Sequence, residues 1–232
     1  AEGCLGKEEC PVECCAAGCC ESAEGVKITE AGEFAVVEGA DFSYQFNLHY
    51  GHLEKLGDFL KAPMQLTIWK APTDNERNVR TKWEQGEKYD RAHNKVYEYA
   101  IEGNTIRVKA ALATVSKLPF FKYEAVYTFL ADGRVDVALD GEFDQSRTFL
   151  PRLGFEFKTA EKEFAYFGYG PYESYIDMHH GSWMGMFEST AEKEYVPYIM
   201  PQEHGSHYNT KCLKMGGFEF VSAQGFCCNV SE

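Results

Sequence analysis

Hydrophobic and polar residues alternate along much of the chain, and a period of two is typical of half-buried β-strands. The pattern runs through residues 42–46 (FSYQF), 123–130 (YEAVYTFL) and 135–139 (VDVAL). Asp132 and Gly133 lie between the last two segments, and an Asp-Gly pair flanked by alternating hydrophobic residues is a strong hairpin signal. We therefore predict two antiparallel strands that are joined by a turn at Asp132-Gly133.

Other alternating segments extend this pattern over the rest of the chain. The turn-forming residues Glu102-Gly103-Asn104 separate segments 96–101 and 106–115, and further strands are predicted at 153–157 and 218–221. Short strands with turn signals between them are typical of a sandwich or a barrel. The predicted fold class is therefore all-β.

One helix is expected to interrupt the strands near residues 76–92. Thr73 and Glu76 have the spacing of a capping box, in which each side chain accepts a hydrogen bond from the backbone N–H of the other residue. Trp83, Lys88 and Tyr89 follow in a mostly polar segment. The pattern predicts a short helix on the surface of the domain.

The composition is that of a globular protein, since 44% of the 232 residues are hydrophobic and 15% are aromatic. A chain of this length suits one large domain or two small ones. Its formal net charge of −13 argues against binding to nucleic acid or to an anionic membrane surface. No apolar segment approaches the roughly 20 residues of a membrane-spanning helix, and the first residues lack the features of a secretory signal.

Six of the nine cysteines fall within the first twenty residues, at Cys4, Cys10, Cys14, Cys15, Cys19 and Cys20. Four close thiolates could hold zinc, but adjacent cysteines depart from the usual zinc spacing. A small disulfide knot is a second interpretation, which the odd total weakens. Because residues 1–25 offer almost nothing to bury, a flexible acidic leader is the favoured interpretation. The predicted organisation is this leader at 1–25, followed by one β domain at 26–232.

The most polar cluster is Glu203-His204-Gly205-Ser206-His207. Two imidazoles and a carboxylate could bind a transition metal. Pro201 and Gly205 favour a loop, however, and no third ligand can be named, so a hydrogen-bonded loop between strands is favoured over a metal site. The pair His179-His180 is interpreted in the same way, as part of a turn.

Paired carboxylates are required for glycoside hydrolysis, and Glu173, Asp177 and Glu203 are candidates. Nothing in the sequence marks one of them as buried, and any acidic protein supplies such residues. The chain has no Gly-x-Ser-x-Gly motif, phosphate-binding loop or dinucleotide fingerprint. The residues alone therefore do not predict an enzyme.

Five segments, in order along residues 35–232, resemble the C-terminal domain of family 2 β-galactosidases. Residues 68–75 (IWKAPTDN) are similar to the W-R-A-P-T-D-N motif of that domain, with Lys70 where the family commonly has Arg. The other matches are residues 37–54 with its first strand pair, 150–154 with L-P-R-x-G, 166–177 with G-x-G-P-x-E-x-Y-x-D, and 195–205 with Y-x-x-P-Q-E-N/H-G.

The resemblance implies a galactose-mutarotase-like β-supersandwich of two large antiparallel sheets. It also implies that the catalytic glutamates, and the ligands of Mg²⁺ and Na⁺, lie in a (β/α)8 barrel that precedes this domain in the full enzyme. A barrel of ~250 residues does not fit in this chain beside the domain. We therefore expect no catalytic residue, metal ligand or cofactor in the chain, inactivity of the chain alone, and a domain that is truncated at its C-terminus.

The expected function is that of a non-catalytic domain, which supports the catalytic barrel, shapes the cleft rim for a β-galactoside bound at a distance, and helps to form a homo-oligomer. One alternative is a carbohydrate-binding module whose contacts come from Tyr169, Tyr172, Glu203, His204 and His207, with Tyr175 and Trp183 as further stacking residues. The other is a mutarotase-like epimerase that uses Glu203 and His204. The cysteine usage suits the cytoplasm.

Overall fold

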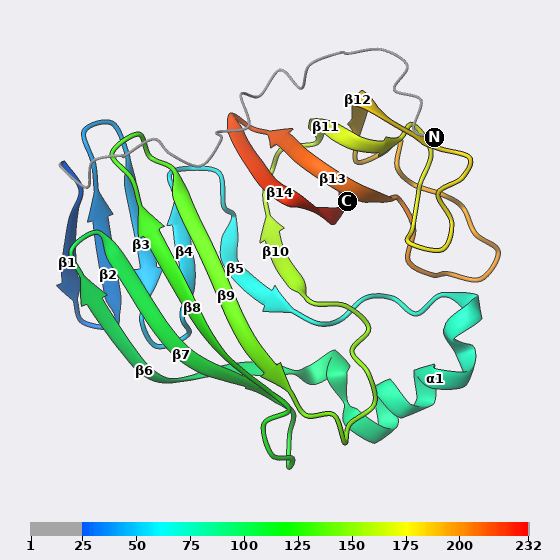
Figure 1. The fold of residues 1–232 in the computed structure, drawn as a ribbon, viewed down its shortest axis with the longest axis horizontal. Coiled ribbons are helices and arrows are strands. Elements are labelled where there is room, and N and C mark those ends of the chain that lie inside the picture. The colour runs from blue at the N-terminus through cyan, green and yellow to red at the C-terminus, as the bar shows by residue number, and fades with distance from the viewer. Residues whose placement is uncertain (1–24, 232) are drawn as a thin grey trace, which may run out of the picture. The chain divides into compact units, whose positions relative to one another are not determined.

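The computed structural model describes residues 25–231, which form two compact units (Figure 1). The N-terminal unit consists of residues 25–160 together with 200–202, and the C-terminal unit consists of residues 161–199 and 203–231. The predicted leader lies outside the described residues except for Gly25, so its zinc, disulfide and flexible-leader interpretations stay predictions. Within the described part of the chain, no helix is long and apolar enough to cross a membrane.

The described strands of the N-terminal unit form three antiparallel sheets. The first has the order β1-β2-β3-β4, with strands at Lys27–Ala31, Phe34–Glu38, Ser43–Asn47 and His52–Leu56. The second has the order β6-β7-β8-β9, with strands at His93–Glu102, Thr105–Ala113, Phe121–Phe129 and Val135–Phe143. The third is the pair β5 (Ala62–Thr67) and β10 (Gly154–Lys158).

The two four-stranded sheets pack face to face, because alternate residues of their strands are apolar and buried. On β8, residues 121, 123, 125, 127 and 129 are buried while the residues between them are partly or fully exposed. Tyr127 packs against Phe46 of β3 with ring centroids 4.8 Å apart, and the hydroxyl of Tyr44 donates to the carbonyl of Gly133 at 2.7 Å. The core of the N-terminal unit therefore lies between these sheets (Figure 1).

The hairpin predicted at Asp132-Gly133 is confirmed. Strands β8 and β9 pair antiparallel from Phe121↔Phe143 to Phe129↔Val135. The backbone N–H of Leu130 donates to the carbonyl of Arg134 at 2.9 Å, and Gly133 has a φ of +87°. A glycine adopts this backbone conformation without strain, so the sequence and the turn agree.

A helix was predicted near residues 76–92, but only residues 77–81 of that segment are α-helical. Four short elements follow one another, namely a 3₁₀ turn at Asp74–Glu76, α1 at Arg77–Thr81, a π-helical turn at Lys82–Glu87 and a 3₁₀ turn at Tyr89–Arg91. The Thr73 N–H donates to the Glu76 carboxylate at 2.8 Å, as the predicted capping box requires. Lys88 adopts a left-handed conformation with φ of 61°, which ends the π-helical turn and separates it from the last 3₁₀ turn.

Trp83 and Tyr89 anchor this segment in the core of the N-terminal unit, although the pattern predicted a helix on the surface. Both are almost fully buried. The indole N–H of Trp83 donates to the backbone carbonyl of Phe149 at 2.8 Å. The hydroxyl of Tyr89 donates to the backbone carbonyl of Thr148 at 2.6 Å. Each polar atom is therefore satisfied inside the core, which makes the burial of these large side chains favourable.

The C-terminal unit contains one antiparallel sheet of the order β12-β11-β13-β14. Its strands lie at Glu163–Gly170 (β11), Trp183–Thr190 (β12), Ser206–Met215 (β13) and Phe218–Asn229 (β14). Because β13 runs antiparallel to β11, the end of β11 and the start of β13 lie at the same end of the sheet. The loop of residues 171–182 begins at that end. The loop of residues 191–205 begins at the opposite end of the sheet, where the N–H of Ala191 donates to the carbonyl of Lys162 at 2.9 Å, and it runs back to the start of β13.

The predicted all-β class with antiparallel sheets and one short helix is confirmed. The strands are divided among four sheets, where the resemblance implied two large ones, because β5 and β10 pair only with each other and the remaining strands form three groups of four. The single domain predicted at 26–232 stays a prediction, since two compact units can still fold as one cooperative domain.

Candidate functional site

The carboxylate of Glu173 joins the two long loops of the C-terminal unit. It follows β11 in the segment Pro171-Tyr172-Glu173-Ser174-Tyr175. It accepts hydrogen bonds from the hydroxyl of Tyr175 at 3.2 Å, from the backbone N–H of Gly205 at 3.0 Å and from the hydroxyl of Tyr198. Three donors from different parts of the chain thus converge on one carboxylate, which holds the loops in a defined arrangement.

This carboxylate also makes its tyrosine partners weaker acids. The hydrogen bond from Tyr198 to Glu173 raises the pKa of Tyr198 to about 12, because the phenolate form would lose that bond and face a negative charge. Burial, followed by the charge of Glu173, raises the pKa of Tyr175 as well. Both hydroxyls therefore stay protonated and act as donors at neutral pH.

Ser174 holds the same loop to β13 and has no exposed surface. Its hydroxyl donates to the carbonyl of Tyr169 at 3.1 Å and accepts from the N–H of Tyr208 at 2.9 Å. Its backbone N–H donates to the carbonyl of Ser206 at 2.7 Å. The polar groups of this buried serine are paired, so the loop after β11 is fixed by internal bonds.

His207 lies at the centre of the unit, with no exposed surface. Its Nε2 is 3.0 Å from a carboxylate oxygen of Glu194, and its Nδ1 is 3.3 Å from the carbonyl oxygen of Tyr169. A carbonyl and a carboxylate both only accept, so the ring of His207 lies between two hydrogen-bond acceptors. The ring of Tyr166 stacks on it with centroids 4.0 Å apart.

Glu194 is the buried hydrogen-bond partner of His207. Burial alone would raise the pKa of Glu194, but hydrogen bonds from His207 and Ser189 outweigh this effect and hold the pKa below its ordinary value. The backbone carbonyl of Glu194 also lies 3.1 Å from Nδ1 of His204. The loop that returns along the sheet is therefore bonded to both histidines of the polar cluster.

The five residues predicted as a sugar-contacting set come from one end of the sheet but differ in exposure. Tyr172 is 68% exposed, whereas His207 is fully buried. Tyr169, Glu203 and His204 are half-buried. The ring of Tyr169 packs against Tyr208 at 5.8 Å and that of His204 against Tyr195 at 5.3 Å. The carbonyl of Glu203 accepts a hydrogen bond from Tyr175 at 3.5 Å.

The interpretation of residues 203–207 as a loop holds for residues 203–205 only, because Ser206 and His207 are the first two residues of β13. A turn is present at His179-His180, where the backbone N–H of Ser182 donates to the carbonyl of His179 at 3.1 Å. Within residues 25–231, no group of three or more His, Cys, Asp or Glu side chains could hold a metal ion. Internal hydrogen bonds therefore hold the polar side chains at this end of the sheet.

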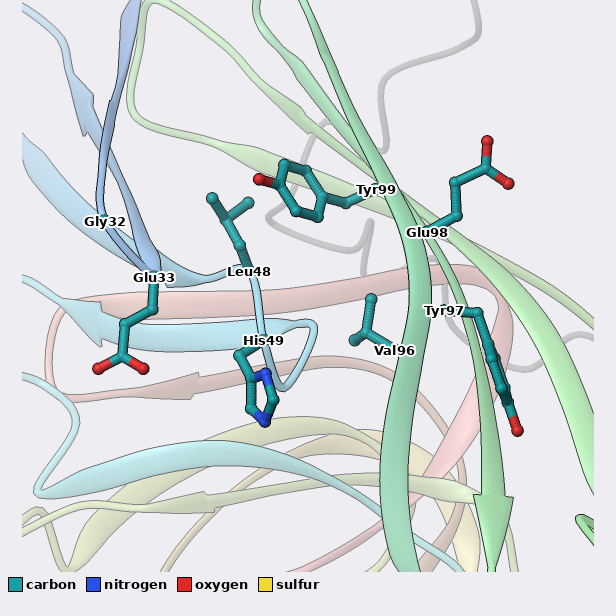
Figure 2. Close-up of a pocket in the computed structure, with 8 residues that line it drawn as sticks. All are labelled: Gly32, Glu33, Leu48, His49, Val96, Tyr97, Glu98 and Tyr99. Atoms are coloured by element: carbon teal, nitrogen blue, oxygen red, sulfur yellow. The ribbon is translucent and has the colours of Figure 1, made fainter.

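The sequence did not indicate a small cleft in the N-terminal unit, shown in Figure 2. The cleft has a volume of about 290 Å³ and lies between two turns of the first sheet, at Gly32-Glu33 and Leu48-His49, and the edge strand β6. Tyr99 points towards Leu48, whereas Tyr97 and Glu98 point away from it (Figure 2). The Tyr99 hydroxyl donates to Glu30 at 2.8 Å. Its volume is near the lower end of the range that is typical of small-molecule sites.

Comparison with known proteins identifies the class to which this scaffold belongs. Residues 38–232 match the family described as beta galactosidase small chain. The chain belongs to this β-galactosidase small-chain family, and its all-β fold agrees with that assignment.

Individual relatives carry the same name. The chain is 34% identical to a β-galactosidase of Actinobacillus pleuropneumoniae over 205 residues, which cover 84% of this chain and 20% of that enzyme. It is 32% identical to a β-galactosidase of Streptococcus thermophilus over 160 residues (66% of this chain, 15% of that enzyme). It is 29% identical to that of Lactobacillus delbrueckii subsp. bulgaricus over 187 residues (75% and 18%). The chain thus spans a fifth or less of the length of these relatives.

Proposed function

We propose that this chain is a non-catalytic domain of a larger β-galactosidase, which supports the catalytic barrel and shapes one rim of its cleft. The observation that carries the proposal is the match of residues 38–232 to the small-chain family, combined with coverage of only 20% of the Actinobacillus enzyme. Most of such an enzyme lies outside the matched segment, and a (β/α)8 barrel alone takes ~250 residues.

The geometry of the C-terminal unit supports a scaffolding role. The carboxylates of Glu173 and Glu194 both serve as internal hydrogen-bond acceptors. A general acid or base needs a carboxyl group that can reach the substrate and exchange a proton with it. These two groups instead fix loops, which is the requirement for a rim of constant shape.

In this proposal, the catalytic glutamates and the Mg²⁺ and Na⁺ ions lie in the part of the full enzyme that this chain does not cover. The described residues contain no suitable cluster of His, Cys, Asp or Glu, so they do not fit a Mg²⁺ site built from side chains. The substrate, a terminal β-galactoside, would meet this chain only at the cleft rim, and the domain would help to form a homo-oligomer of the full enzyme. The cytoplasm is the proposed compartment, because Cys227 and Cys228 are free thiols.

The test is to assay the isolated chain with a chromogenic β-galactoside and to titrate it calorimetrically with galactose. The proposal expects no hydrolysis above the rate without protein. Hydrolysis that survives purification would contradict it, and Glu173→Gln and Glu203→Gln would then be the first variants to assay.

A carbohydrate-binding module is the second candidate, and the exposure of two aromatic rings favours it. Tyr172 is 68% exposed and Trp183 is 56% exposed, so either ring can stack on a sugar face. Heat of galactose binding without hydrolysis, abolished by Tyr172→Ala or Trp183→Ala, would favour this candidate over a purely supporting domain.

A further inference from the structure

Two loops of the C-terminal unit carry large apolar side chains that are exposed. The loop patch consists of six residues, namely Tyr172, Ile176 and Met178 from the loop between β11 and β12, and Tyr195, Tyr198 and Ile199 from the loop between β12 and β13. Ile199 is 99% exposed and Ile176 is 74% exposed. Large apolar side chains that are exposed on neighbouring loops are typical of an interaction site, because leaving them in water is unfavourable.

Internal hydrogen bonds hold these two loops together. Glu173, next to Tyr172, accepts a hydrogen bond from Tyr198, next to Ile199. The backbone groups of Tyr175 and Met178 exchange hydrogen bonds of 2.8 and 3.1 Å, so Ile176 lies at the tip of a tight turn. A surface that is already ordered loses little conformational entropy when a partner binds.

The low charge and the apolar side chains of the loop patch favour an apolar protein surface as its partner. Glu173 and Asp177 are the only charged residues in segments 171–178 and 195–199, and the carboxylate of Glu173 is bonded internally. Isoleucine has no hydrogen-bonding group and the methionine sulfur is only a weak acceptor, so these side chains are poor partners for the hydroxyl groups of a sugar. Low charge with exposed aromatic and aliphatic residues is typical of the buried centre of a protein–protein interface.

We propose that the loop patch is the surface on which the catalytic part of the parent β-galactosidase docks. This inference rests on the proposed function, since it takes the partner to be the rest of the same enzyme. The chain covers only 20% of the Actinobacillus relative, so four-fifths of an enzyme of that size is available to cover the patch. The family is described as a small chain, which fits a unit that associates with a larger one.

The experiment measures binding of this chain to the Actinobacillus enzyme from which the matching 205-residue segment has been removed. Restoration of activity by that enzyme's own segment verifies that the large fragment is competent. Affinity is then measured for this chain and for its variants Ile176→Asp and Ile199→Asp, which alter exposed side chains and leave the fold intact. Leu118→Asp is the matched control, because Leu118 is 78% exposed and lies in the loop between β7 and β8 of the N-terminal unit.

The expected result is that the chain binds, that each patch variant binds at least about 30-fold more weakly, as for the loss of an interface hot spot, and that the control stays within about 2-fold. Equal binding by all variants would overturn the loop patch as the docking surface and leave the proposed function standing. Failure of the unaltered chain to bind, while the enzyme's own segment binds, would overturn both. Self-association of the chain that Ile199→Asp abolishes, without binding to the large fragment, would show that a second copy is the partner and would also overturn the inference.

Discussion

Replacing Glu194 with glutamine tests how far the buried contact with His207 stabilises the C-terminal unit. The side chain of His207 is 0% exposed and that of Glu194 is 8% exposed, so water screens their interaction very little. Glutamine removes the charge of the carboxylate that accepts this buried hydrogen bond, and disrupting a buried pair of this kind costs about 3 kcal/mol in the free energy of unfolding. For a chain of 232 residues this corresponds to a melting temperature lower by roughly 6–12 °C.

The pH dependence gives this prediction a signature of its own. Because the folded-state pKa of Glu194 is lowered, its contribution is complete above the pKa of the unfolded chain and is lost as the pH falls through the folded-state value. The difference in stability between the unaltered protein and Glu194→Gln is therefore expected to be constant near neutral pH and to shrink in acid.

The assay is urea denaturation at several pH values, with Glu192→Gln as the control, since Glu192 is an exposed carboxylate two residues away in the same loop. The control is expected to change the free energy of unfolding by less than about 0.5 kcal/mol. A loss below about 1 kcal/mol for Glu194→Gln, or a loss that does not depend on pH, would refute the argument that the buried carboxylate of Glu194 holds this loop.

Two further predictions concern the core and the loop carboxylate. Trp83→Ala is expected to lower the free energy of unfolding by about 3–5 kcal/mol in urea denaturation, because a fully buried ring and its hydrogen bond to Phe149 are lost. A change below about 1 kcal/mol would contradict the observed burial. Glu173→Gln is expected to lower the pKa of Tyr198 from about 12 towards the ordinary tyrosine value near 10, which NMR titration of the labelled tyrosine ring would measure. An unchanged pKa of Tyr198 would show that its hydrogen bond to Glu173 does not form in solution.

Features set by neighbouring residues could be predicted from the sequence. Asp132-Gly133 forms its hairpin because the turn depends on the backbone freedom of one glycine and on the alternation beside it. The Thr73–Glu76 contact forms because both residues lie in the same turn. The loop at residues 203–205 was expected from Pro201, Gly205 and the polar side chains, which again are local signals, whereas the start of β13 at Ser206 was not expected.

Features that depend on distant parts of the chain could not be predicted. Glu194 lies in the charged run Glu192-Lys193-Glu194, which reads as solvent-exposed, and only the return of its loop along the sheet places it beside His207. Trp83 was expected on a surface helix, and its burial depends on residue 149, which lies 66 positions further along the chain. The cleft of Figure 2 combines turns near residues 33 and 49 with β6, so no short segment could reveal it.

The central claim is that this chain supplies structure to a β-galactosidase and leaves the chemistry to another part of the enzyme. The most direct measurement compares hydrolysis of a chromogenic β-galactoside by the large fragment of the Actinobacillus enzyme alone, by this chain alone, and by the two together. The account predicts that neither part is active alone and that activity returns on mixing, in proportion to the amount of complex formed. Hydrolysis by this chain alone, or no gain on mixing when the enzyme's own segment does restore activity, would contradict it.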